Sequence, residues 1–217
     1  MEFNKIIAIT GKPGLFEILT QTKNSLIVQS LLDKKRFSIN ATQNVSLLEN
    51  IAIYTCPATS IQFGETKEQS QAVGLSERFC EKFEEMCAKG QTVIYCGTVG
   101  TGKTRLVSAI LQTLGFGRYI RAVDISRELR ASYSDNSRTE LEIITELVEC
   151  PLLVIDEVGV QFGTANEQMI ISDIIDRRYG DLRPTIISSN LNQVELAKTF
   201  GERAWSRINQ NCLICPM

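Results

Sequence analysis

Apolar and polar positions divide the chain into two regions with different spacing. In residues 1–56, turns rich in glycine, proline, asparagine and lysine separate short β-type apolar runs at residues 6–9, 15–19, 25–28 and 51–54. This alternation predicts a small β-rich domain built as a strongly bent sheet or barrel. Residues 57–71 are polar and poor in apolar side chains, which is typical of a linker. We therefore place a domain boundary there.

The second region, residues 72–217, alternates helical patterns with short strand-like runs. A helical pattern over residues 72–88 opens it, and strand-like runs follow at residues 92–96, 119–123, 152–156, 185–189 and 212–215. Strands that alternate with helices favour right-handed β-α-β crossovers. The predicted fold is therefore α/β, with a parallel five-stranded sheet flanked by helices on both faces.

Composition narrows the class of protein. The 217-residue chain is 43% hydrophobic and 22% charged, the balance of an ordinary globular protein. Its apolar runs are only a few residues long, and its first residues lack the pattern of a secretory signal. We therefore predict a cytoplasmic protein with no membrane association. A net charge of −2 also gives it no broad attraction to nucleic acids, so any such binding must be local.

One local cluster of basic residues bears on nucleic-acid binding. It consists of Arg118, Arg121, Arg127, Arg130 and Arg138. Three acidic residues interrupt the cluster and dilute its charge. A local DNA contact and a solvated amphipathic helix both explain this pattern, and the sequence leaves the two interpretations open.

Cysteine and histidine usage excludes several kinds of chemistry. The seven cysteines are scattered through strand-like and helix-like segments, which fits reduced thiols in the cytosol. Cys212 and Cys215 form a C-x-x-C pair, but no second pair exists and the chain contains no histidine, so a zinc site is disfavoured. We interpret the pair as part of an apolar strand, with a redox pair as the alternative. Without histidine, Ser-His-Asp and Cys-His catalysis are excluded.

A glycine-rich segment carries the strongest chemical signal. It fits the phosphate-loop pattern G-x-x-x-x-G-K-[ST] between a buried strand and a helix. Its glycines let backbone N–H groups turn toward phosphate oxygens, its lysine reaches the β- and γ-phosphates, and its threonine offers a hydroxyl to Mg²⁺. The predicted nucleotide-binding residues are Gly97, Thr98, Val99, Gly100, Thr101, Gly102, Lys103, Thr104 and the adjoining Arg105.

A second acidic motif complements this loop. Asp156 and Glu157 end another buried strand-like run, where a purely structural strand has little need of two carboxylates. We expect Asp156 to act with Thr104 in binding Mg²⁺, and Glu157 to polarise an attacking water. The alternative is an ordinary solvated strand end. Taken together, the two motifs predict binding of ATP or GTP with Mg²⁺, followed by hydrolysis.

Several further segments occur in a recognisable order over residues 70–217. They lie at residues 152–161, 174–179, 183–185, 188–190 and 201–207. With these motifs the region resembles the DnaC family of bacterial and phage replicative helicase loaders. These are AAA+ P-loop ATPases close to the IstB-type ATP-binding proteins of transposons. The first 55 or so residues resemble a small bacterial domain of unknown function.

The resemblance implies roles for three more residues. It makes Asn190 the sensor that helps orient the lytic water, where the residues alone allow a strand-terminating turn. It makes Arg207 the arginine finger that completes the nucleotide site of a neighbouring subunit, with Arg203 as a second candidate. For both arginines, an ordinary exposed helix position is the alternative. A finger supplied to a neighbour implies a homo-oligomer.

The resemblance also implies partners, and two departures from the family pattern bear on them. A loader of this kind acts on a replicative helicase and single-stranded DNA, with ATP binding driving assembly and hydrolysis driving release. The β-rich first region stands where family members carry a helical segment that grips the helicase. The sequence also ends at Met217, soon after the fifth predicted strand, so we expect no helical lid over the base. An IstB-like transposition protein and a non-catalytic, nucleotide-gated adaptor remain the alternatives.

Overall fold

The structure is a computed structural model of the chain. It describes residues 6–9, 12–21, 25–30, 34–40, 45–47, 78–79, 81–83, 85–114, 116–133, 138–159 and 165–217. Within these ranges, no helix is long and apolar enough to cross a membrane. The predicted linker at 57–71 and the predicted strand at 51–54 lie outside the described residues, so the domain boundary stays a prediction.

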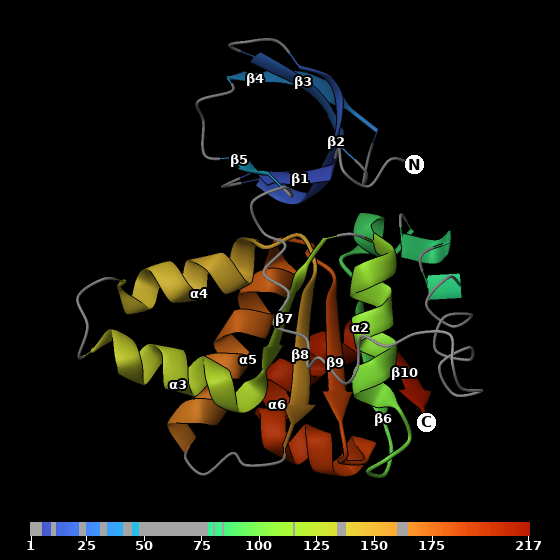
Figure 1. The fold of residues 1–217 in the computed structure, drawn as a ribbon, viewed down its shortest axis with the longest axis vertical. Coiled ribbons are helices and arrows are strands. Elements are labelled where there is room, and N and C mark those ends of the chain that lie inside the picture. The colour runs from blue at the N-terminus through green and yellow to red at the C-terminus, as the bar shows by residue number, and fades with distance from the viewer. Residues whose placement is uncertain are drawn as a thin grey trace.

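The first region forms an antiparallel five-stranded sheet in the order β4-β3-β2-β1-β5 (Figure 1). Its strands are β1 (Ile6–Ile9), β2 (Lys12–Gln21), β3 (Ser25–Ser30), β4 (Arg36–Asn40) and β5 (Val45–Leu47). Alternate side chains such as Phe16, Ile18 and Val28 are buried, because successive residues of a strand point to opposite faces. The prediction of a small β-rich region is confirmed.

The second region is built on a parallel sheet in the order β10-β6-β9-β8-β7. Its strands are β6 (Thr92–Cys96), β7 (Arg118–Arg121), β8 (Leu153–Val158), β9 (Thr185–Ser189) and β10 (Cys212–Pro216). The five predicted strands are therefore confirmed. The end predicted for the second of them is wrong, because Ala122 and Val123 already belong to the following helix, which begins one residue after Arg121.

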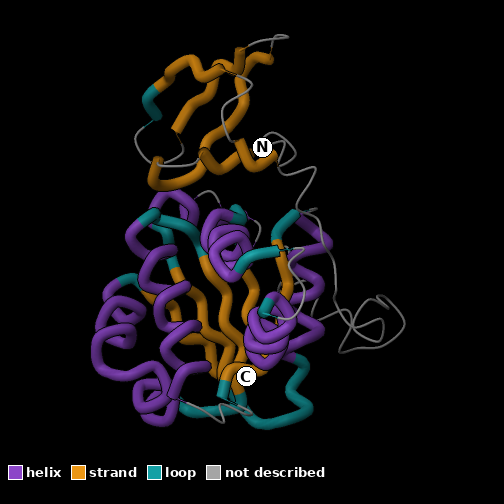
Figure 2. Tube along the Cα trace, turned by 90° about the vertical axis from the view of Figure 1, so that its left-hand side faces the viewer, coloured by secondary structure: helices purple, strands orange, loops and turns teal. Residues whose placement is uncertain are grey.

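Helices cover both faces of this sheet, as Figure 2 shows. They are α2 (Lys103–Leu114), α3 (Ala122–Ser132), α4 (Glu140–Glu149), α5 (Ala165–Gly180) and α6 (Gln193–Gln210), with further helical residues between 78 and 89. Two apolar clusters result. Val93 packs with α2 on one face, whereas its neighbour Ile94 packs with α3 to α6 on the other. The sheet is thus buried on both sides, as its nearly continuous apolar strands require.

A buried arginine joins three elements on the second face. Arg178 of α5 is only 1% exposed. Its guanidinium donates hydrogen bonds to the carbonyl oxygens that end α4, to the carbonyl of Pro184 and to the hydroxyl of Thr185. Burial lowers the pKa of Arg178 to about 10, so the group is still charged at neutral pH. It supplies donors to helix-end carbonyls that have no partner within their own helix.

Cys212 and Cys215 lie on opposite faces of β10. Cys212 packs against the cluster that contains α3 to α6, and Cys215 packs against the cluster that contains α2. Both are free thiols. Two residues that are three positions apart on a strand point to opposite faces of the sheet. This arrangement keeps the two sulfur atoms on different sides of the sheet. It supports the interpretation of the pair as part of an apolar strand.

Candidate functional site

The glycine-rich loop connects β6 to α2 at the carboxyl edge of the sheet. At Gly97, an added Cβ would lie 2.2 Å from the carbonyl oxygen of Met217, so the close approach of this residue, which directly follows β10, requires glycine. Gly100 and Gly102 have open space around them but φ angles of 87° and 89°. These left-handed conformations favour glycine for their backbone geometry. The loop therefore takes its shape from glycine for two different reasons.

Lys103 begins α2 and turns its ammonium group back into this loop. The Nζ atom donates to the carbonyl oxygens of Gly97 (2.8 Å) and Thr98 (2.7 Å) and to the hydroxyl of Thr101 (3.2 Å). The residue is buried, and burial lowers the pKa of Lys103 while the charge of Asp156 opposes the shift. A phosphate group that entered the loop would replace these neutral acceptors with charged ones, which bind an ammonium more strongly.

Asp156 lies at the centre of a small polar network on β8. Its Oδ2 atom accepts hydrogen bonds from the Thr104 hydroxyl (2.8 Å) and the Tyr119 hydroxyl (2.7 Å), and its Oδ1 atom accepts one from the backbone N–H of Glu157 (2.9 Å). The carboxylate is 1% exposed. Three donors compensate its burial. The network brings the two predicted Mg²⁺ ligands, Thr104 and Asp156, together from α2 and β8.

Glu157 differs from the rest of β8, because it alone among the six residues of this strand is exposed. Its φ angle is +58°, a left-handed value that is uncommon for a residue other than glycine. The pairing of β8 with β9 also shifts by one residue between Ile155 and Val158, which is the geometry of a β-bulge. Glu157 is thus placed outside the core, where it lines the same pocket as residues of the glycine-rich loop.

The order of the strands places Asn190 between the two motifs. Because β9 lies between β6 and β8, the turn after Ser189 opens between the glycine-rich loop and the acidic pair. The Ser189 hydroxyl fixes this turn by donating to the carbonyl of Val158 (2.6 Å) and accepting from the N–H of Leu191 (3.0 Å).

These elements enclose one pocket of about 350 Å³. It is lined by six of the nine predicted nucleotide-binding residues, by Asp156 and Glu157, and by Ser188 and Asn190. The structure thus brings the phosphate loop, the acidic pair and the sensor candidate together.

Arg203 and Arg207 lie elsewhere, on the second half of α6. Neither lines the pocket that holds the glycine-rich loop. Both instead contact Asp176 of α5: the Arg207 Nε atom lies 2.5 Å from its carboxylate, and an Arg203 Nη atom lies 3.5 Å from it. The structure therefore separates the two arginines from the nucleotide pocket of their own chain.

Three polar residues with contacts at these sites were not expected from sequence. Tyr119 donates to Asp156, Ser188 lines the pocket, and Asp176 pairs with both arginines. A signal existed for Ser188, which directly precedes Ser189 and Asn190 at a strand end. Asp176 lies in the 174–179 segment that carries the family resemblance, but nothing in that segment indicates its partner. Tyr119 gave no signal. The partners of Tyr119 and Asp176 lie 37 and 31 residues away in sequence, and only the fold brings them together.

Comparison with known families adds to this geometry. A family model described as IstB-like ATP binding protein matches residues 26–208, most of the chain. The chain belongs to this IstB-like ATP-binding family. Membership supports ATP as the ligand of the pocket. A model for a domain of unknown function, DUF5606, matches residues 3–48, so the resemblance of the first region to such a domain is also confirmed.

The relatives of this IstB-like protein include replicative helicase loaders. It is 33% identical over 148 residues to the replicative helicase loader DnaC of Escherichia coli K12. The aligned residues cover 66% of this chain and 59% of the relative. The chain thus matches about three-fifths of the length of that curated relative. DnaC of Buchnera aphidicola from Acyrthosiphon pisum is 34% identical over 145 residues, 64% of this chain and 58% of the relative. The predicted resemblance to the DnaC family is confirmed.

A solved structure shows the same fold. A crystal structure of the DnaC helicase loader aligns with a TM-score of 0.57 at 24% sequence identity, over 72% of this chain and 93% of the other. At this identity the likeness concerns the fold. The predicted fold of the second region, a parallel five-stranded sheet flanked by helices, is therefore confirmed.

Proposed function

We propose that this protein is an ATP-hydrolysing helicase loader of the DnaC type. The observation that carries the proposal is the single pocket in which a phosphate loop, an acidic pair and Asn190 converge. The homology to DnaC supports the replication role. In this proposal ATP binding drives assembly of several copies on a replicative helicase and single-stranded DNA, and hydrolysis drives release.

Each side chain of the pocket has its own chemical role in this proposal. Lys103 binds the β- and γ-phosphates, and the backbone N–H groups of the loop hold the remaining phosphate oxygens. Thr104 and Asp156 hold Mg²⁺, since a hydroxyl and a carboxylate 2.8 Å apart supply the hard oxygen atoms that this ion prefers. When bound, Mg²⁺ neutralises charge on the phosphates. Glu157 polarises the attacking water, and Asn190 orients it.

The two arginines act on a neighbouring copy. Because Arg207 lies outside its own nucleotide pocket, it can stabilise transition-state charge only in the pocket of a second subunit. Arg203 is more exposed, with 82% of its side chain accessible, and is the weaker candidate. Self-association is therefore part of the proposed mechanism.

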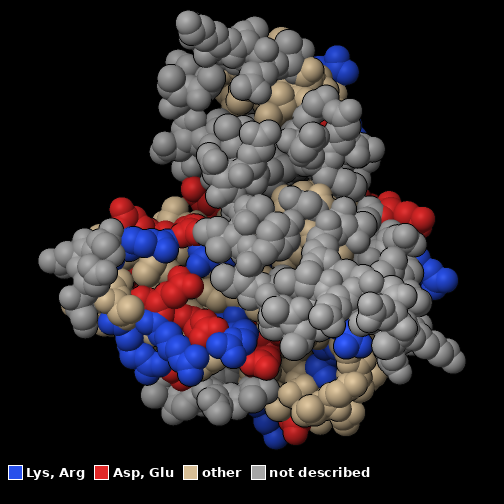
Figure 3. Space-filling view, in the orientation of Figure 1, with Lys and Arg blue, Asp and Glu red and all other residues tan. Residues whose placement is uncertain are grey.

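The exposed arginines of α3 offer a surface for single-stranded DNA. Basic side chains gather over this part of the molecule, interleaved with acidic ones (Figure 3). Arg121 and Arg127 pair with Asp124, and Arg130 lies 3.6 Å from Glu167, so their charge is partly neutralised. The double change Arg127→Ala with Arg130→Ala should weaken single-stranded DNA binding. It should also reduce the slope with which the affinity falls as the salt concentration rises. Unchanged affinity and salt slope would remove α3 as the DNA surface.

Two variants test the nucleotide chemistry. Lys103→Ala should weaken Mg-ATP binding about 100-fold, because it removes charge-assisted hydrogen bonds worth about 3 kcal/mol. Glu157→Gln should keep binding and stop phosphate release, with or without single-stranded DNA. Calorimetry with Mg-ATP and a steady-state phosphate assay measure the two effects. Turnover by Glu157→Gln would remove its assignment, and absence of any heat or thermal shift with Mg-ATP would refute the proposal as a whole.

The family assignment favours a second candidate, an ATP-binding protein of transposition. The same pocket would then drive assembly on duplex DNA. Stimulation of phosphate release by single-stranded DNA, together with ATP-dependent capture of a replicative helicase, supports the loader. ATP-dependent filaments on duplex DNA without either effect would support the transposition protein instead.

A further inference from the structure

Arg207 is held at two points by α5. Its Nε atom lies 2.5 Å from the Asp176 carboxylate, and its guanidinium carbon lies 5.7 Å from the centre of the Tyr179 ring. Asp176 and Tyr179 are three residues apart on one helix, so both face α6. The Tyr179 hydroxyl in turn donates to the Gln210 side chain at the end of α6. The guanidinium is therefore fixed by a charge on one edge and by an aromatic ring across one face.

The opposite edge of this guanidinium remains available. Among the described residues, Arg207 has no ion pair or hydrogen bond beyond its contact with Asp176. Its side chain is 37% exposed, so it lies at the surface rather than in the core. A guanidinium carries N–H donors on both of its edges, and the terminal Nη atoms match the geometry of a phosphate group. Arg207 is thus a rigid donor with room for an acceptor from outside the chain.

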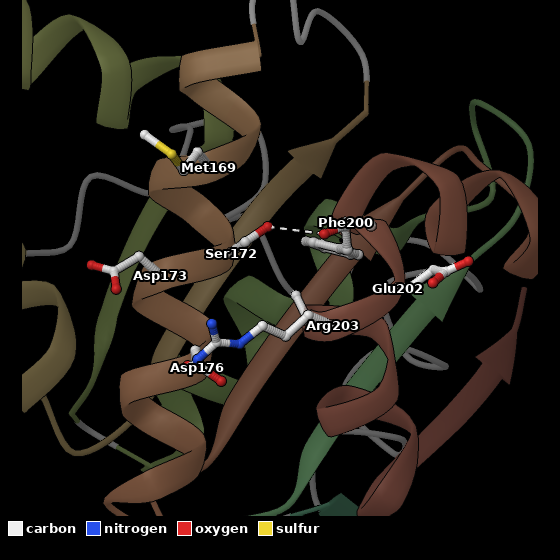
Figure 4. A pocket seen from close by; sticks show the side chains of 9 residues that line it. Met169, Ser172, Asp173, Asp176, Phe200, Glu202 and Arg203 are labelled. Atoms are coloured by element: carbon white, nitrogen blue, oxygen red, sulfur yellow. Dashed lines mark hydrogen bonds and ion pairs between the residues drawn. The ribbon is translucent and has the colours of Figure 1, made fainter.

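The helix that carries Arg207 is broken six residues before it. Gly201 has φ 75° and ψ 162°, values outside the helical range, and α6 resumes after it in a new direction. The Ser172 hydroxyl donates to the freed carbonyl of Phe200 at 3.1 Å, which ties α5 to the break (Figure 4).

A pocket of about 360 Å³ lies between the two helices at this break. Asp173, Asp176 and Arg203 are among its lining residues. The Asp176 side chain is 26% exposed, but the Oδ1 atom that contacts Arg207 is itself buried.

We propose that Asp176 is the positioning residue of Arg207, with the Tyr179 ring as its support. The inference rests on the proposed role of Arg207 as a finger for a neighbouring subunit. An arginine side chain loses rotamer entropy when it binds a phosphate, and one that is already held loses less. Asp176 therefore increases turnover in the neighbouring pocket without contacting nucleotide itself. Arg203 contacts the same carboxylate more loosely and is not the residue that Asp176 positions.

Assemblies mixed from two variants test this inference. One variant, the acceptor subunit, hydrolyses ATP, and the other, the donor subunit, supplies the arginine finger. The acceptor carries Arg207→Ala, so it binds ATP but offers no finger. The donor carries Lys103→Ala, so it offers a finger but does not turn over ATP itself. We expect the donor to restore phosphate release by the acceptor. A donor with both Lys103→Ala and Asp176→Asn should restore at least tenfold less, through a lower kcat with the same KM for ATP.

Asp173 provides the matched control. It lies on the same helix, lines the same pocket and pairs with an arginine, Arg177, but it does not contact Arg207. A Lys103→Ala donor with Asp173→Asn should restore turnover fully. To show that Asp176→Asn folds correctly, the same change is placed in the Arg207→Ala acceptor, which should respond normally to a Lys103→Ala donor.

The outcomes separate this inference from the proposed function. If the simple Lys103→Ala donor restores nothing, the finger role and the inference are both wrong. If it restores turnover and Asp176→Asn performs as well as Asp173→Asn, the finger role stands and the positioning role is wrong. A donor that improves with Asp176→Asn would show that the carboxylate restrains Arg207, which also contradicts the inference.

Discussion

Replacement of the buried Arg178 by methionine should strongly destabilise the second region. The Arg178 guanidinium donates to five oxygen atoms, four of them backbone carbonyls, at distances of 2.5 to 2.9 Å. Arg178→Met keeps much of the side-chain volume and removes every donor. Three of the carbonyls end α4, and water cannot readily replace the guanidinium there because the site is buried. The weak Cys150 thiol donor, 3.4 Å from the Leu147 oxygen, would remain.

The magnitude follows from two opposing effects. Each buried carbonyl that loses its donor costs about 1–3 kcal/mol. Removal of a buried charge returns several kcal/mol of desolvation free energy. We therefore expect Arg178→Met to lower the free energy of unfolding by about 3–5 kcal/mol, a large share of the about 5–15 kcal/mol typical of a domain.

The neighbouring Arg177 makes the test specific. Its side chain is 48% exposed and forms a surface ion pair with Asp173, so Arg177→Met should cost less than about 0.5 kcal/mol. Urea unfolding followed by the fluorescence of the single tryptophan, Trp205, and by circular dichroism compares the two variants. A loss below about 1 kcal/mol for Arg178→Met, or equal losses for both, would refute the reasoning.

Three other side chains have measurable consequences. Tyr119→Phe removes a donor from buried Asp156 and should lower the free energy of unfolding by about 1–2 kcal/mol in urea titrations; an unchanged midpoint would contradict the network. Burial lowers the pKa of Lys103 below its usual 10.5, so ATP affinity should fall as pH rises through that lowered value. The ATP affinity of Lys103→Arg should stay constant over the same pH range, because arginine does not lose its proton there. Burial raises the pKa of Cys212 to about 12, so iodoacetamide at pH 8 should label it at least tenfold more slowly in native than in urea-unfolded protein, and equal rates would contradict its burial.

The sequence predicted the elements that carry chemistry better than the contacts between them. The phosphate loop and the acidic pair each combine a local pattern with a flanking strand, and both patterns can be recognised without the fold. The order of the strands cannot be read in this way. The position of β9 between β6 and β8 places Asn190 beside both motifs, and that position depends on long-range pairing.

Arg178 shows what periodicity could have added. It follows Asp176 and Arg177 in a charged run, which is typical of a solvated helix face. However, the buried positions of α5 include Ile171, Ile174 and Ile175, and Arg178 continues that same stripe at helical spacing. A charged residue on an apolar stripe indicates a buried group with dedicated partners. The identity of those partners, at the end of α4 and the start of β9, was available only from the structure.

At position 157, the residue that favours stability differs from the residue that we assign to activity. A left-handed conformation costs a glutamate on the order of 1 kcal/mol that glycine would not lose. A laboratory selection for survival at high temperature would therefore favour Glu157→Gly, and each variant chosen in this way would lack the carboxylate that we assign to water activation. Engineering of a robust form of this protein should hold position 157 fixed and seek its gains elsewhere.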